Sequence, residues 1–126
     1  MLTGEHVHGE FTSADASTAA VVTLYTGDGV ARALVAGERL VIQSFHVVVG
    51  ASGLTVTLFD DRDADGTADA GEIIARGTFA ANGSLSESGI LHYCKQAVTA
   101  NVLAPKVKTS GAGQVDVVLR GFIIKS

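Results

Sequence analysis

The chain has 126 residues, of which 47% are hydrophobic and 17% charged, with a mean hydropathy of +0.35. This composition excludes a disordered chain, and the length favours a single domain with its own core. One cysteine and one proline exclude a disulfide scaffold, a zinc module built on paired cysteines and a proline-rich linker. The sequence has no apolar run long enough for a membrane helix and no secretory signal, so we expect a soluble protein made in the cytoplasm.

The formal charge of −4 is unevenly distributed. Residues 60–72 hold six acids and one base, a net charge of −5, while the remainder of the chain carries +1. Lys106 and Lys108 are the only close pair of bases, so the sequence offers no basic patch for a phosphate backbone. We therefore expect no binding to nucleic acid.

The first eighteen residues are polar, with Leu2, Val7 and Phe11 as their few apolar anchors. We predict that residues 1–18 form an arm outside the folded domain. His6 and His8 would share one face of an extended segment and could hold a transition metal. Because the other ligands of a closed site are not evident nearby, we interpret both imidazoles as solvent-exposed.

Residues 19–126 have the composition of an all-β domain, since Val, Ile and Thr make up about a quarter of the chain and glycines punctuate it at short intervals. Leu54, Val56 and Leu58 alternate with threonines, as in a strand buried on one face. We predict an antiparallel β-sandwich of jelly-roll type. Its strands are expected at 19–25, 30–35, 38–49, 53–59, 73–79, 90–104 and 113–124.

Two finer features are predicted for this domain. The turn-forming segment TSGAGQ before Val115 favours a hairpin between the last two strands. No window repeats apolar residues at helical spacing, so helix is limited to about one turn between Asp69 and Arg76.

The twelve residues from Asp61 to Glu72 carry oxygen side chains at positions 1, 3, 5, 9 and 12, with Gly66 at position 6. This spacing resembles the calcium loop of EF-hands and dockerin-like repeats, in which the glycine takes the sharp turn and the last glutamate supplies two oxygens. The resemblance implies a structural Ca²⁺. Its ligands would be Asp61, Asp63, Asp65, Thr67 through its carbonyl, Asp69 and Glu72.

This loop departs from the EF-hand pattern in two respects. Position 8 is Ala68, where a larger apolar residue is usual, and the preceding residues LTVTLF indicate a strand and not an entering helix. The alternative is an acidic, solvated connection between strands that binds nothing, because Asp and Gly are ordinary turn residues.

Catalytic motifs are missing from the sequence: it has no GxSxG elbow, no HExxH and no phosphate loop. Cys94 and His92 would share a strand face, but a lone cysteine in a β domain is usually a small buried hydrophobe. His46 lies in an apolar run and is interpreted as a sheet residue. We therefore expect the protein not to be an enzyme.

Strand 38–49 is apolar on both faces, which favours burial against another subunit and hence a closed homo-oligomer. The segments AGERLVIQSFHVVVG, GLTVTLFDD, GTFAANGS and APKVKTSGAGQVDVVLRGFI, together with the acidic loop, resemble small jelly-roll decoration or cement proteins of tailed bacteriophage capsids. The resemblance implies a homotrimer on the virion surface that stabilises the lattice of the major capsid protein. The arm at 1–18 would then reach neighbouring capsid subunits.

Two other classes stay open. A calcium-dependent carbohydrate-binding or adhesion sandwich would share the fold and the loop, although five Phe, two Tyr and no Trp leave few aromatic platforms for sugars. A small enzyme using Cys94 and His92 is the third class.

Overall fold

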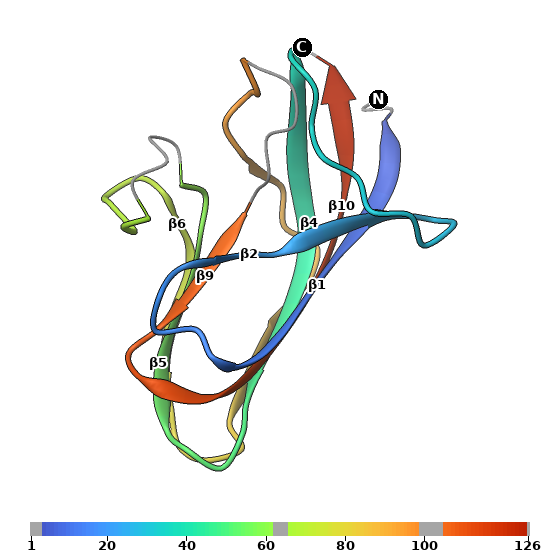
Figure 1. The fold of residues 1–126 in the computed structure, drawn as a ribbon. Coiled ribbons are helices and arrows are strands. Elements are labelled where there is room, and N and C mark those ends of the chain that lie inside the picture. The colour runs from blue at the N-terminus through green and yellow to red at the C-terminus, as the bar shows by residue number, and fades with distance from the viewer. Residues whose placement is uncertain (1–3, 62–65, 99–104, 126) are drawn as a thin grey trace.

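The computed structural model describes residues 4–61, 66–98 and 105–125, and within these ranges it contains β-strands and no helix (Figure 1). The all-β class predicted from composition is thus confirmed. The strands are β1 (Glu5–Asp15), β2 (Ala20–Val21), β3 (Thr23–Thr26), β4 (Glu38–Val49), β5 (Leu54–Phe59), β6 (Ile73–Phe79), β7 (Ser84–Glu87), β8 (His92–Tyr93), β9 (Lys106–Thr109) and β10 (Ala112–Lys125).

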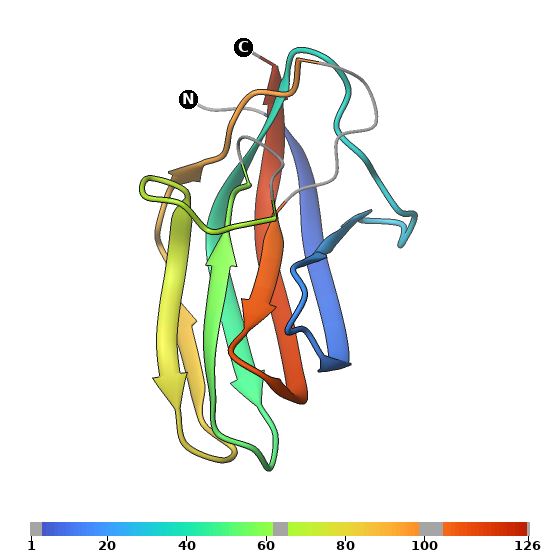
Figure 2. The same ribbon diagram turned by 60° about the vertical axis from the view of Figure 1, so that its left-hand side comes forward.

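The strands form two antiparallel sheets that lie face to face (Figure 2). Sheet A has the order β3-β1-β10-β4-β7, with β8 also paired to β4, and sheet B has the order β2-β9-β5-β6. This arrangement confirms the antiparallel sandwich, whereas the jelly-roll connectivity stays a prediction.

The core lies between the sheets and follows the alternation of apolar residues along the strands. Val115, Val117 and Leu119 of β10 are at most 1% exposed, and β5 turns Leu54, Val56 and Leu58 into the same cluster. Because side chains of a strand alternate between its faces, the residues between these reach the outer faces of the two sheets.

A register shift interrupts the pairing of β4 with β10 between Arg120 and Gly121, where Gln43 is the extra residue of β4. At Gly121 a Cβ atom would lie 2.1 Å from the Val41 carbonyl oxygen, so only glycine fits this close backbone approach. Beyond the shift, Val41 and Phe122 are buried outside the main core cluster.

Several predicted strands are found in place. The ranges 38–49 and 73–79 match β4 and β6, and 53–59 and 113–124 match β5 and β10 within one residue at each end. The predicted strand 30–35 is wrong, since this segment forms isolated bridges at Ala31, which pairs with Tyr25, and at Leu34. Of the predicted strand 90–104, the structure gives β8, and residues 99–104 lie outside the described ranges.

The predicted N-terminal arm is wrong for the residues that the structure describes. β1 spans Glu5–Asp15 and lies between β3 and β10, so it is an interior strand of sheet A. The apolar pattern is weak because Gly9 takes an inward position, where a Cβ would lie 2.8 Å from a side-chain atom of Leu119. Backbone pairing with two neighbours holds the strand in spite of its polar composition.

The hairpin predicted at the segment TSGAGQ is also wrong, because β9 and β10, the strands on either side of this segment, belong to different sheets. β9 pairs with β2 and β5 in sheet B, whereas β10 pairs with β1 and β4 in sheet A. The turn before β10 therefore carries the chain from one sheet to the other.

A partly buried ion pair between Arg32 and Glu38 fixes the segment that leads into β4. Both guanidinium Nη atoms of Arg32 donate to the Glu38 carboxylate, at 2.8 and 2.7 Å, and the Val35 N–H donates to Glu38 Oε1 at 2.8 Å. The hydrogen bonds from Arg32 lower the pKa of Glu38 to about 2, against the opposing effect of burial.

We expect deletion of residues 1–15 to prevent folding, because it removes a strand that pairs on both edges. Circular dichroism should show loss of the β signal and of a cooperative melting transition. Deletion of residues 1–3 alone, which precede β1, serves as the control and should leave the transition in place. A cooperative melt of the longer deletion would contradict the interior role of β1.

We expect stability to fall as the pH drops from about 4.5 toward 2. The pKa of Glu38 is depressed in the folded state, so its contribution is present above its ordinary pKa of 4.5 and is lost as pH falls through about 2. Glu38→Gln should cost roughly 2–3 kcal/mol at neutral pH, as a charged hydrogen-bond partner is lost. Urea unfolding at pH values from 7 to 2 checks this, since the difference in unfolding free energy between wild type and variant should become smaller in acid.

Candidate metal centre at the acidic loop

The acidic loop connects β5 to β6 toward the end of the sandwich at which β1 begins and β10 ends (Figure 2). Its base is closed by the Asp60 N–H, which donates to the Glu72 carbonyl at 2.8 Å. The loop thus leaves and rejoins sheet B at neighbouring points.

The start of the loop is organised around Asp61. Its side chain is 2% exposed, and Oδ2 accepts the Gly66 N–H at 2.8 Å. Gly66 has a φ of +75°, in the left-handed region that favours glycine. The sharp turn expected at the sixth position is therefore present.

The end of the loop is organised around Glu72, which is 4% exposed. Its Oε1 accepts the Asp69 N–H at 2.9 Å, and its own N–H donates to the Asp69 carbonyl at 3.1 Å. Gly71, between them, has a φ of +86°. Asp69 is half-buried and Thr67 is exposed.

The predicted ligand set is placed only in part. Asp61, Thr67, Asp69 and Glu72 are described, whereas Asp63 and Asp65 lie outside the described residues. Among the residues that are described, no group of three or more His, Cys, Asp or Glu side chains is arranged to hold a metal ion. Carboxylate and carbonyl oxygens are donors that calcium prefers, so the donor chemistry of the loop fits Ca²⁺ while its coordination stays a prediction.

Sequence reasoning did not identify Lys106 and Asp60 as residues that shape the electrostatics at this end of the loop. Lys106 of β9 places Nζ 2.7 Å from Asp61 Oδ2, and the carboxylate of Asp60, itself 3% exposed, accepts the Lys95 N–H at 2.8 Å. β9 pairs Lys106 with Phe59, which brings the ammonium group to the start of the loop. Only the register of the unpredicted strand β9 could have indicated this contact.

The histidine pair of β1 lies on the outer face of sheet A. His8 stacks on Tyr25 with ring centroids 5.6 Å apart, and its Nε2 lies 3.1 Å from Glu10 Oε2. His6 contacts Phe122 edge-on at 6.3 Å. The two imidazoles thus have neighbours on their own sheet, and their side chains are exposed or half-buried.

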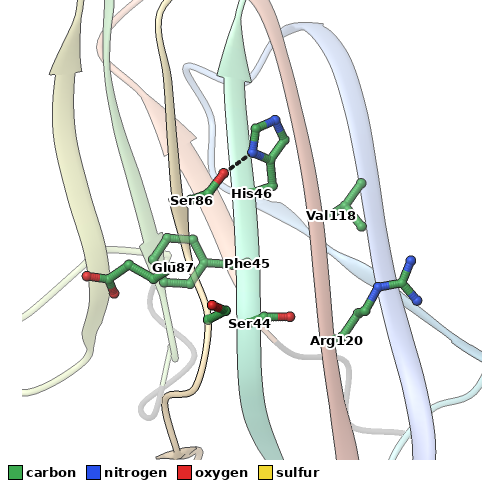
Figure 3. Close-up of a pocket in the computed structure, with 8 residues that line it drawn as sticks. Ser44, Phe45, His46, Ser86, Glu87, Val118 and Arg120 are labelled. Atoms are coloured by element: carbon green, nitrogen blue, oxygen red, sulfur yellow. Dashed lines mark hydrogen bonds between the residues drawn. The ribbon is translucent and has the colours of Figure 1, made fainter.

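The same face carries a row of shallow depressions, one of which is drawn in Figure 3. It is lined by side chains of β4, β7 and β10, with His46 hydrogen-bonded to Ser86 and with Val118 and Arg120 opposite them. His46 is a sheet residue, as predicted.

Cys94 is 1% exposed and belongs to the main core cluster. The interpretation of this thiol as a small buried hydrophobe is confirmed. His92 lies two residues before it, on β8, which pairs with β4.

Comparison with protein-family models, with curated proteins and with solved structures gave no match for this chain. In the described part of the chain, no helix has the length and apolar character needed to span a membrane. The functional argument therefore rests on the sandwich, its outer faces and the acidic loop.

Proposed function

We propose that the protein is a structural component of a bacteriophage virion that decorates and stabilises the capsid exterior as an oligomer. The observation that carries this proposal is the outer face of sheet A. It is a broad sheet surface with several adjoining shallow depressions. Small-molecule sites are usually concave and mostly apolar, whereas contacts between proteins use broad surfaces with a polar rim.

The side chains of this face support a protein contact. Val118 of β10 is 39% exposed and lies among polar neighbours, including Arg120 and His46. An apolar centre surrounded by hydrogen-bonding groups is typical of interfaces that dissociate. Because β1 is part of sheet A, we propose that the outer face of this sheet, and not an N-terminal arm, contacts the capsid.

The homotrimer and the lattice of the major capsid protein as partner are what the resemblance to decoration proteins implies, and both belong to this proposal. The virion surface as location follows from the same resemblance.

In the proposal, Ca²⁺ binds the loop through Asp61, Asp63, Asp65, Thr67, Asp69 and Glu72 and acts as a structural ion. The buried carboxylates of Asp61 and Glu72 and the turn at Gly66 support it. A divalent ion would offset the net charge of −5 on residues 60–72.

We expect calcium to raise the melting temperature. A site with a dissociation constant of about 0.1 mM, saturated at about 100 times that value, adds about 2.7 kcal/mol, or roughly 8–10 °C for a chain of this size. Differential scanning calorimetry in calcium and in chelator measures the increment. Glu72→Gln should reduce it most, because this change removes the bidentate carboxylate.

The matched control is Glu87→Gln, which removes an exposed carboxylate at the end of β7, a strand of sheet A, whereas the loop joins two strands of sheet B. It should keep the full calcium increment. Equal melting curves of the wild type in calcium and in chelator would leave the acidic, solvated connection as the explanation of the loop.

We expect the protein to co-sediment with capsids of the virus that encodes it, after those capsids have been stripped of the chain. Val118→Glu should weaken this binding at least tenfold, because it puts a charge at the apolar centre of the face. Lys108→Glu is the control, since Lys108 is exposed on sheet B. Absence of co-sedimentation, or equal loss in both variants, would contradict docking through sheet A.

A calcium-dependent carbohydrate-binding or adhesion module is the second candidate. The stacked rings of His8 and Tyr25, on the face that also carries Arg120, favour it, since sugars are held by aromatic faces and hydrogen-bonding side chains. Binding to immobilised polysaccharide that is lost in chelator, without binding to capsids, would favour this candidate over decoration.

A further inference from the structure

β6, an edge strand of sheet B, is longer and less covered than the other edge strands of the sandwich. β2 has two residues and β7 has four, while the edge of β3 is covered by the Arg32 N–H, which donates to the Leu24 carbonyl at 2.8 Å. β6 has seven residues and, within the described chain, pairs only with β5. The pairing of β6 with β5 shifts register only next to Phe59 of β5, so residues 75–79 of β6 form a regular edge.

The hydrogen-bond pattern tells which groups of β6 point outward. The Ser110 N–H donates to the Thr55 carbonyl, so Thr55 faces β9 and the next residue, Val56, faces β6. Gly77 is the partner of Val56 and therefore faces β5. Because main-chain groups alternate along a strand, Arg76 and Thr78 direct their N–H and C=O groups to the free edge.

The side chains of this edge do not shield it. Arg76 is turned toward β5, where its Nε donates to Thr57 Oγ1 at 3.2 Å, and the hydroxyls of Thr78 and Thr55 are 2.9 Å apart. The edge carries no proline and no lysine, which are common devices against edge pairing. An extended chain could therefore add to sheet B here.

We propose that β6 pairs antiparallel with β6 of a second copy of this chain, with the two-fold axis at Gly77. This register places Arg76 of each copy opposite Thr78 of the other in hydrogen-bonded pairs, as the outward groups require. Ala75 then lies opposite Phe79 of the second copy. The two B sheets join into one continuous eight-stranded sheet.

Charge and length select this register and a second copy as the occupant. An axis at Arg76 would set like charges directly opposite each other, which destabilises a strand pair. An axis at Thr78 would overlap only residues 77–79 of β6. The edge is thus complementary to itself at Gly77, whose Cβ position is already filled by the ring of Phe79, 2.8 Å away. This two-fold contact is independent of the proposed function and of any three-fold contact on a capsid.

Sedimentation equilibrium of the full chain tests the proposal, with a concentration-dependent monomer–dimer equilibrium as the expected result. Thr78→Pro removes an outward N–H without removing a bond to β5, and it should abolish the dimer. The matched control is Ser84→Pro. Gly83 accepts the Val49 N–H, so Ser84 faces away from β4 in the same manner, on the other sheet. This variant should dimerise like the wild type.

A pair of charge variants tests the register and does not depend on a proline. Thr78→Glu places a carboxylate opposite Arg76 of the second copy twice in the dimer, and it should tighten dimerisation by roughly 2- to 30-fold. Thr78→Lys should weaken it by a similar factor. Melting temperatures establish that each variant is folded.

Three results would overturn the proposal: a wild type that stays monomeric at millimolar concentration, an oligomer that Thr78→Pro leaves intact, or equal effects of Thr78→Glu and Thr78→Lys on dimerisation.

Discussion

The pairing of β10 on both of its edges is the constraint on which the sandwich depends. β10 binds β1 along one edge and β4 along the other, so three strands of eleven or more residues share one continuous hydrogen-bond network. The first and last parts of the sequence are thereby neighbours in space. Such long-range pairs form only after large loops close, so we expect the sheet to assemble cooperatively and with the whole chain present.

The register of this network also determines which chemistry reaches each face. The shift at Gly121 changes the phase of β10 against β4, and the Val41 carbonyl occupies the space that a side chain would need there. On one side of the shift the outer face of sheet A carries polar groups such as Arg120 and His46. On the other side Val41 and Phe122 are buried on the same strands. The outer face of sheet A thus changes its side-chain environment at the bulge, from exposed polar groups to buried apolar ones.

Much of this fold could be predicted from alternation, and the failures have local physical causes. β4, β5 and β6 were found because β-branched and apolar residues dominate them. β1 was missed because Gly9 replaces an apolar residue beneath Leu119, and β9 because two of its four residues are lysines. In the candidate site, the turn at Gly66 follows from spacing alone. The Lys106 contact depends on a strand pairing that no local pattern encodes.

The carboxylates at the two ends of the acidic loop are held by hydrogen bonds and by Lys106. Asp60, Asp61 and Glu72 all keep their carboxylates out of water, where unpaired charges are costly. Backbone N–H groups offset part of this cost, and Lys106 adds one positive charge at Asp61. The Ca²⁺ proposed for this loop would compete with Lys106 for Asp61 Oδ2, so the proposed affinity depends on this lysine.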